Sequence, residues 1–444
     1  MTDHLNRLED LLKAAKAAGA DAADAVYAEG DSLSHTQRLG TVEMIERSEG
    51  RDLGLRVLVG HRQASVSATE IEPKTFAGLA ERAVAMARAV PEDPFCGIAG
   101  PDMIAGQPPG IEMADAEEPP ADLLIARASE AEDAARAVEG VTNSEGAEAS
   151  WGRTQIFLAA TNGFSGSYAR TSHSVGVSVV AGSGADMQTD YDYHTAVFSA
   201  DLMAPAAIGR SAGKRAIARL GARSVKTVKA PVVFDPRVAG SLLRHLLGAI
   251  NGASVARGTS FLKDRLGKAV MASGLTVVED PHRPRGLRSK PFDGEGVANC
   301  RRNLVESGVL TTWLLDLRSA RQLDLAPTGH ASRGTSGPPS PSATNVYLEP
   351  GTVSQQEMLG GIDSGLYVTE MIGMGVNGVT GDYSRGAGGI WIDKGEPAFP
   401  VTEMTVAGNL KDMFKAITPT DDLDLRYGID APTLRIDGMT VAGA

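Results

Sequence analysis

Apolar and polar residues along the first 90 positions predict a helix, a group of strands and a second helix. Residues 5–18 carry apolar side chains at helical spacing, and this pattern stops at Gly19. From 23 to 71, short segments alternate apolar with polar residues and are separated by Gly and Asp, which is typical of an antiparallel meander. Helical spacing returns over residues 73–90. The pattern therefore predicts a compact α+β unit.

The periodic pattern is interrupted once before it resumes. Residues 91–120 are rich in Pro, Gly and acidic side chains and have no period, so we interpret them as a linker. A helix is predicted over 121–140, followed by strand-like runs and another helix over 204–220. We therefore predict an N-terminal α+β domain over 1–120 and a helical and β middle segment over 121–225 that continues the core.

The remaining residues, 226–444, are mostly strand-like. Apolar runs joined by Gly-containing turns, as in residues 303–315 and 389–401, indicate hairpins. Strands and helices do not alternate regularly, which argues against a doubly wound parallel sheet. The predicted fold class is α+β. An N-terminal antiparallel meander flanked by helices precedes a C-terminal, mostly antiparallel, barrel-like β domain with a few helices.

Charge and apolar content narrow the classes of function. A net charge of −12 argues against direct binding of nucleic acid, because such proteins use basic surfaces to displace counterions. The dense basic segment 209–229 is interpreted as a solvated helix face. No run approaches the roughly 18 apolar residues of a membrane helix, and the start lacks the features of a secretory signal. We therefore expect a cytoplasmic protein without a membrane partner, in which Cys96 and Cys300 are free thiols.

Three polar residues alternate along one predicted strand. Asp190, Asp192 and His194 share one face of it, and Tyr191 and Tyr193 share the other. Two carboxylates and an imidazole could bind a divalent metal, which would make the chain an independent hydrolase. The alternative interpretation is that the polar residues form the solvent-facing side of the strand, which is the commoner use of such alternation.

Two stretches in the last third have a composition suited to binding. Residues 328–351 form a long polar loop that contains His330, and such a loop either serves as a lid over a ligand or connects two strands. Residues 379–396 combine Tyr383 and Arg385 with a run of glycines that allows close approach of the backbone. This second stretch either shapes a ligand channel or makes a tight turn.

The helix predicted over residues 241–250 carries a histidine near its middle. A zinc hydrolase helix places two histidines about a turn apart and a glutamate beside the first, because zinc needs about three protein ligands and an open position for water. Here Arg244 and His245 occupy the positions of the first pair, and Ala249 occupies that of the second histidine. One imidazole beside a guanidinium cannot hold the ion.

Much of the chain resembles the TldD/PmbA family of bacterial and archaeal metallopeptidases, and in particular its PmbA branch, also called TldE. The resemblance is carried by residues 231–267, 291–297, 310–331, 344–351 and 381–413, and it extends over most of the N-terminal part. In that family the TldD-type subunit carries an H-E-x-x-x-H zinc helix and a late cysteine ligand. Against that pattern Arg244 stands at the first histidine, His245 at the glutamate and Ala249 at the second histidine, and the late cysteine has no counterpart.

The resemblance implies a heterodimer. A TldD-like paralogous subunit would hold zinc and cleave unfolded or leader peptides, and this chain would complete the enclosed peptide cavity without a cofactor or catalytic residues of its own. The roles associated with the family are peptide maturation, antitoxin degradation and an indirect link to DNA gyrase. The residues that we expect to face the cavity are Arg257, Thr259, Ser260, His330, Asp382, Tyr383 and Arg385.

A second class of function stays open at this point. The same β-rich framework could serve a stand-alone peptide-binding or regulatory protein that has no peptidase partner, since strand addition captures peptides through backbone hydrogen bonds.

Overall fold

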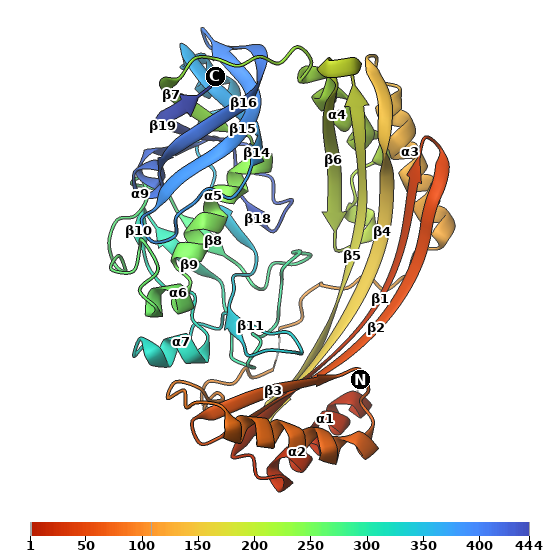
Figure 1. Cartoon of the computed structure of the whole chain (residues 1–444), viewed down its shortest axis with the longest axis vertical. Helices are drawn as coiled ribbons and strands as arrows, with labels where there is room; N and C mark the ends of the chain where they lie inside the picture. Colours follow the sequence, from red (N-terminus) through yellow and green to blue (C-terminus); the bar gives the residue numbers. More distant parts are fainter. Residues whose placement is uncertain (1, 108, 444) are drawn as a thin grey trace.

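The first half of the chain is a curved antiparallel sheet with helices on one face (Figure 1). The computed structural model describes residues 2–107 and 109–443. The elements of this half are α1 (Thr2–Ala17), β1 (Ala22–Arg38), β2 (Thr41–Val59), β3 (Arg62–Ala68), α2 (Pro73–Ala89), α3 (Ala121–Arg136), β4 (Val141–Ala160), β5 (Ser165–Ala181), η1 (Gly184–Asp186), β6 (Gln188–Ala196), η2 (Ser199–Asp201) and α4 (Pro205–Ala218).

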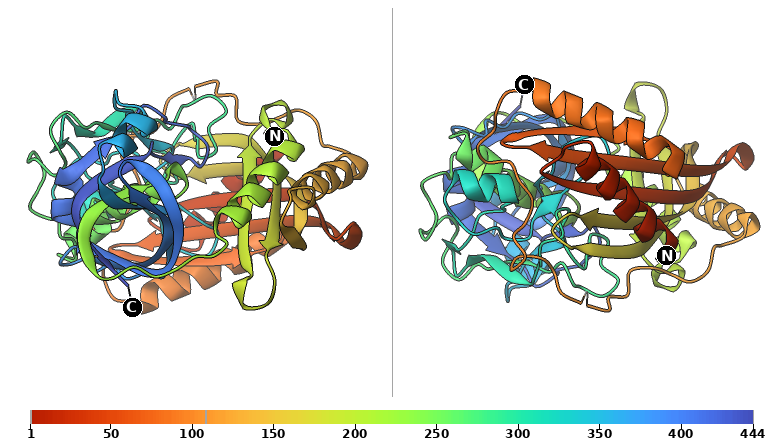
Figure 2. Two further views of the ribbon diagram at one scale, coloured as in Figure 1. Left: turned by 90° about the horizontal axis from the view of Figure 1, so that it is seen from above. Right: turned by 90° about the horizontal axis from the view of Figure 1, so that it is seen from below.

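The strands of this sheet are long. They lie in the order β3-β2-β1-β4-β5-β6, and β1 and β4 contain 17 and 20 residues. Strands this long span several times the usual length of about 5–6 residues, and the twist inherent in each strand bends the sheet. The second half of the chain lies on the concave side (Figures 1 and 2).

Two helix pairs cover opposite ends of the other face. Near one end, leucines of α1 and α2 pack on Tyr27 and Phe157. Near the other end, alanine-rich α3 and α4 pack on Trp151 and Val175. Because side chains alternate along a strand, this arrangement leaves the intervening positions of β1, β4 and β5 on the concave face.

The second half is built mainly of strands. Its elements are β7 (Val228–Phe234), α5 (Pro236–Ala249), α6 (Gly252–Ala256), β8 (Val277–Glu279), β9 (Arg302–Glu306), β10 (Val309–Leu310), α7 (Leu317–Gln322), β11 (Ala331–Ser332), β12 (Ser340–Pro341), β13 (Val346–Leu348), α8 (Gln355–Gly360), β14 (Ser364–Ile372), β15 (Asp382–Asp393), β16 (Glu396–Asn409), α9 (Leu410–Met413), η3 (Phe414–Ala416), β17 (Ile417–Pro419), β18 (Ile429–Asp430) and β19 (Leu434–Ala442).

Five of these strands close into a barrel. The order is β16-β15-β14-β7-β19, and an additional pairing of β16 with β19 closes the ring. A second sheet, β10-β9-β8-β13-β18, lies beside the barrel, and the core that fills both includes leucines of α5. The predicted α+β class and the barrel-like C-terminal domain are therefore confirmed.

The structure changes some details of the prediction. Residues 23–38, expected as separate short segments, form one continuous strand, β1. The ranges 1–120 and 121–225 both contribute strands to the same sheet, and the division into domains stays a prediction. Within the described residues, no helix is both long and apolar enough to cross a membrane.

The two halves are joined at one end of the sheet by a buried ion pair. The guanidinium of Arg333, from the turn that follows β11, contacts the carboxylate of Asp24 on β1, and Arg56 on β2 contacts the same carboxylate. A Cβ at Gly54 of β2 would lie 2.3 Å from the carbonyl oxygen of Thr335. The β11–β12 turn therefore sits directly on the backbone of the sheet, where only glycine fits.

Candidate functional site

Helix α5 presents its polar residues away from the barrel core. It begins at Pro236, and the carboxylate of Asp235 caps its first turn. Its leucines are buried in the core of the second half. Arg244 is exposed, His245 is half-buried and Ala249 is buried.

His245 lies in positively charged surroundings. Its Nε2 atom is buried without a hydrogen-bond partner among the described residues, and its ring meets that of Tyr383 edge-on at 5.8 Å between centroids. Burial, together with the charges of Arg385 and Arg244, lowers the pKa of His245 to about 4. The imidazole is therefore neutral at neutral pH.

The surroundings of α5 do not fit a zinc ion. Zinc sites use about three protein ligands, whereas here one imidazole is flanked by two cationic side chains, and Ala249 offers no donor. In the part of the chain that the structure describes, no group of three or more His, Cys, Asp or Glu side chains could hold a metal ion. Zinc in a partner subunit stays a prediction.

Strand β15 places two of the predicted cavity residues beside α5. Tyr383 and Arg385 share a face, and Arg385 donates from Nε to the carbonyl of Gly373 at 2.9 Å. Asp382 lies on the other face, exposed, where hydrogen bonds from Thr380 and Asn409 lower its pKa. The structure thus brings Tyr383 and Arg385 to His245 and leaves Asp382 apart.

The turn that follows α6 is hydrogen-bonded to the end of α5. Arg257 and Thr259 are exposed, and Ser260 is buried. The Ser260 hydroxyl donates to the carbonyl of Ala249 at 2.5 Å and accepts from the N–H of Leu262 at 2.9 Å. Ser260 therefore ties this turn to the end of α5.

His330 belongs to a buried hydrogen-bond network. Its Nδ1 lies 2.7 Å from the Thr328 hydroxyl, and its Nε2 contacts the carboxylate of Glu279. Burial opposes ionisation of Glu279, but His330 and two hydrogen bonds from Thr344 outweigh this effect and lower the pKa of the carboxyl. A role of His330, or of the other predicted residues, in facing a peptide stays a prediction.

The alternating residues of β6 form a buried ion cluster. Asp190 and Asp192 are 4% and 3% exposed, whereas Tyr191 and Tyr193 are 48% and 38% exposed, so the interpretation of the aspartates as solvent-facing is wrong. Alternation separates two faces of a strand but does not say which one is covered. Here α4 covers the acidic face.

Arginines from both halves neutralise these aspartates. Asp190 pairs with Arg237 at 2.8 Å and with Arg219 at 3.5 Å. Asp192 pairs with Arg426 at 2.8 Å and with Arg215 at 3.2 Å. Arg215 and Arg219 lie in the basic segment 209–229, so its interpretation as a fully solvated face is wrong for these two. The carboxylates serve the fold and are not free to bind a metal.

A cleft runs between the concave face of the sheet and the second half of the chain. It consists of two adjoining cavities of about 310 Å³ and 660 Å³ that share Arg170, Leu287 and Arg288. These volumes are typical of ligand sites. None of the seven residues predicted to face a peptide cavity lines either cavity.

Basic side chains outnumber acidic ones in this cleft, although the whole chain has a net charge of −12. The acidic lining residues are Asp31 and Asp293. The basic lining residues are Arg153, Arg170, Arg288, Lys290, Arg333 and Arg426. Arg333 and Arg426 are paired with Asp24 and Asp192, and the remaining four basic residues make the cleft suited to an anionic group.

Comparison with known proteins identifies the family. The chain is 37% identical over 425 residues to the metalloprotease PmbA of Escherichia coli O157:H7, a match that covers 95% of this chain and 92% of that protein. The chain belongs to the PmbA/TldD metallopeptidase family. A PmbA homologue of Haemophilus influenzae is 34% identical, with 96% of this chain and 93% of that protein covered.

The family models follow the architecture. PmbA/TldA metallopeptidase domain 1 matches residues 23–87, the central domain matches 114–220 and the C-terminal domain matches 227–443. The first two models together cover nearly all of the long sheet and of α2, α3 and α4 but not α1, and the third covers the barrel and the adjoining sheet. The cleft therefore lies between regions that the PmbA/TldD family models describe separately.

Solved structures share this fold over the whole chain. A candidate modulator of DNA gyrase from Bacteroides thetaiotaomicron superimposes with a TM-score of 0.91 at 25% identity, covering 99% of this chain and 98% of that one. TldE from Thermococcus kodakarensis has a TM-score of 0.88 at 19% identity and covers 98% and 100%. The PmbA/TldD fold thus includes both halves.

The cations of the cleft were not among the residues predicted from the sequence. Residues 283–290, which read RPRGLRSK, contain four basic side chains within eight positions, and this density is a signal that sequence reasoning could have used. Arg170 gives no such signal, because it stands singly in a strand and only the fold brings it opposite Arg288.

Proposed function

We propose that this chain is the TldE-type, non-zinc subunit of a two-subunit metallopeptidase. A TldD-like paralogue would supply zinc and the catalytic residues, and the complex would cleave unfolded or leader peptides. This chain would act in the cytoplasm and complete the peptide cavity. Membership of the PmbA/TldD family and likeness in fold to a protein named TldE support the proposal.

One observation carries the distinction from a zinc-bearing subunit. At the helix where a zinc peptidase needs two histidines and a glutamate, α5 offers a single imidazole. Burial and the charges of Arg385 and Arg244 lower the pKa of that imidazole to about 4, so it is neutral at neutral pH. A dication beside these two guanidinium groups would be repelled, and no group of three or more His, Cys, Asp or Glu side chains in the described part of the chain could hold it.

The decisive experiment compares the chain alone with the chain co-expressed with an H-E-x-x-x-H relative from the same genome. We expect the complex to hold stoichiometric zinc by elemental analysis and to cleave an unfolded peptide. The chain alone is expected to do neither. Tightly held, near-stoichiometric zinc and peptide cleavage by the chain alone would contradict the proposal.

A stand-alone peptide-binding protein is the second candidate, and the cleft favours it. Both cavities are lined by residues of this one chain, so the cleft is formed without a partner. Purification from the native cell separates the two candidates. Recovery free of any H-E-x-x-x-H relative supports the stand-alone protein, and joint recovery supports the two-subunit enzyme.

A further inference from the structure

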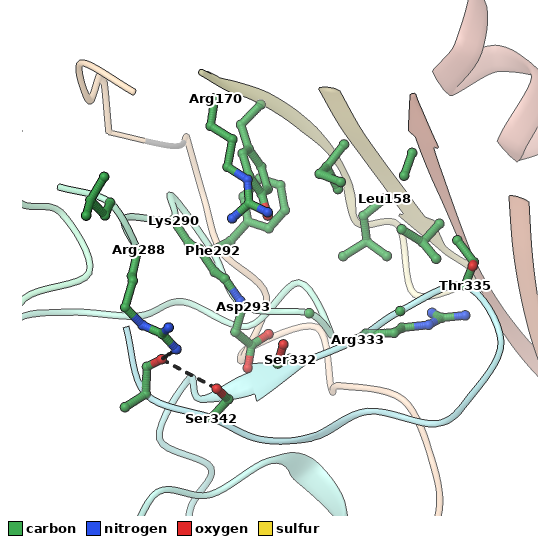
Figure 3. Close-up of a pocket in the computed structure, with 18 residues that line it drawn as sticks. Leu158, Arg170, Arg288, Lys290, Phe292, Asp293, Ser332, Arg333, Thr335 and Ser342 are labelled. Atoms are coloured by element: carbon green, nitrogen blue, oxygen red, sulfur yellow. Dashed lines mark hydrogen bonds between the residues drawn. The ribbon is translucent and has the colours of Figure 1, made fainter. Parts of the chain in front are cut away.

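Four basic side chains line the smaller cavity of the cleft, and one of them, Arg333, is paired with Asp24. Arg170 comes from β5, and Arg288 and Lys290 come from the facing segment of the second half (Figure 3). Leu158 and Phe292 line the same space. The cavity thus draws its cations from both halves.

Arg170, Arg288 and Lys290 form no ion pair with an acidic residue that the structure describes. Arg288 donates to the backbone carbonyls of Thr344 at 3.0 Å and Ala343 at 3.1 Å, which carry no net charge. Arg170 and Lys290 form no side-chain hydrogen bond or ion pair with any residue that the structure describes. Burial, reinforced by the charge of Arg170, lowers the pKa of the Lys290 ammonium. An anion in the cavity would therefore meet three basic side chains that form no ion pair with the described residues.

Asp293, the acidic residue that lines this cavity, makes its hydrogen bonds to the backbone and not to the three cations. Asp293 accepts hydrogen bonds from the backbone N–H groups of Glu295 and Val297, both at 2.8 Å, and of Ala331 at 3.0 Å. Its carboxylate thus accepts hydrogen bonds from the loop that follows it and from Ala331, and burial raises its pKa. It forms no ion pair with Lys290 among the described contacts.

The wall of this cavity that the sheet provides is apolar. Val26 of β1, Ile156 and Leu158 of β4, and Tyr168 of β5 share the concave face and end next to Arg170. Phe292 packs edge-on against Tyr168 at 5.5 Å between ring centroids. An apolar surface beside a group of cations matches a ligand in which an apolar side chain adjoins a negative group.

We propose that this cavity binds a carboxylate of a peptide through Arg170, Arg288 and Lys290, with the neighbouring apolar side chain of the peptide on the sheet. The carboxylate belongs either to the C-terminus of the peptide or to an acidic side chain within it. The inference rests on the proposed function in so far as peptides are the ligands, and it names the class of peptide that this subunit would select.

The larger cavity favours a peptide over a nucleic acid. It continues along the same strands past Gly30 and Gly152, where the absence of side chains lets a ligand approach the face of the sheet closely. A chain with a net charge of −12 would also repel a polyanion over most of its surface.

The test measures binding to the full chain alone by fluorescence anisotropy. The probes are fluorescein-labelled hexapeptides that end in leucine and phenylalanine, with either a free C-terminal carboxylate or an amide. A third probe carries a glutamate before the leucine and a C-terminal amide. We expect the free acid to bind about tenfold more tightly than the plain amide, as charge-assisted hydrogen bonds to the carboxylate imply.

Two variants and a control test whether the preference for the free acid over the amide comes from the cavity. Arg170→Gln and Lys290→Met should each reduce it to about threefold or less, since each removes one of three charges. Arg170 is exposed and has no described partner to lose, so Arg170→Gln keeps the test valid if Lys290→Met folds poorly. Arg210→Gln, on the exposed face of α4, should leave the preference unchanged.

Each outcome decides the proposal. Tighter binding of the free acid or of the glutamate peptide supports it and identifies the source of the carboxylate. Equal affinities for all three peptides, or an unchanged preference in Arg170→Gln, would overturn it. Displacement of every peptide by a single-stranded oligonucleotide of six nucleotides at physiological salt would also overturn it. These readouts do not involve zinc or a partner subunit, so their failure is distinct from failure of the proposed function.

Discussion

Basic side chains have different roles in the ion cluster at β6 and in the cleft. At β6, arginines from α4 and from the second half surround Asp190 and Asp192, and each carboxylate contacts two guanidinium groups. In the cleft, Arg170 and Lys290 face an open cavity without a carboxylate partner among the described residues. The arginines at β6 therefore stabilise the fold, whereas Arg170 and Lys290 are available to bind a ligand.

The largest loss of stability should come from removing a carboxylate of the β6 ion cluster. Asp192→Ala leaves Arg215 and Arg426 without their shared carboxylate, and removal of one partner of a buried ion pair costs about 3–5 kcal/mol. We expect urea denaturation to show a loss of this size in the free energy of unfolding. The matched control is Asp201→Ala, which breaks a surface pair with Arg285 and should cost less than about 1 kcal/mol. Equal losses in the two variants would contradict the assigned role of the cluster.

A smaller loss of stability should result from protonation of His245 as the pH falls. Its pKa is about 4 in the folded chain and about 6.5 in an unfolded one, so the unfolded state takes up the proton first. Stability should therefore decrease between pH 6.5 and pH 4, by at most about 3 kcal/mol. Urea denaturation at pH 7.0, 5.5 and 4.5 should show a flatter dependence in His245→Gln than in the wild type. His61→Gln, at an exposed histidine, serves as the control, and the same slope in both variants would contradict the prediction.

The smallest change in stability should come from substituting an arginine of the cleft that is unpaired among the described residues. Arg170→Gln removes a charge that has no described partner within the chain, so the free energy of unfolding should change by less than about 0.5 kcal/mol. Arg426→Gln, which removes a cleft residue that is bound to Asp192, should cost measurably more. Thermal unfolding of the two variants side by side checks this ranking, and a large loss of stability in Arg170→Gln would show that the residue serves the fold.

Local patterns sufficed to predict much of the fold. Period-2 alternation identified the meander, and Gly-containing turns identified the hairpin of β15 and β16. They did not predict the length of β1, because Gly30 and Asp31 resemble a turn. In the sheet, Gly30 lies opposite Gly50 on one side and Thr154 on the other, and pairing on both sides keeps the strand extended. Such long-range pairing has no local signature.

The candidate site also has one part that could be predicted from local sequence and one part that could not. The prediction that zinc ligands are missing at Arg244, His245 and Ala249 could be made from the spacing of a zinc helix, because that chemistry is local to one helix. The cations of the cleft could not, since Arg170 and Arg288 belong to different halves and meet only in the folded chain. Which face of β6 is buried depended likewise on where α4 packs.

The cleft is fastened at both ends by arginines of the second half. Arg333 contacts Asp24 at one end of the sheet, and Arg426 contacts Asp192 and the carbonyl of Tyr193 at the other. A cleft fixed in this way does not need to close around its ligand, so little conformational entropy is lost on binding. We therefore expect its walls to have nearly the same shape in the free and the bound protein, and selectivity to come from rejecting peptides that do not fit.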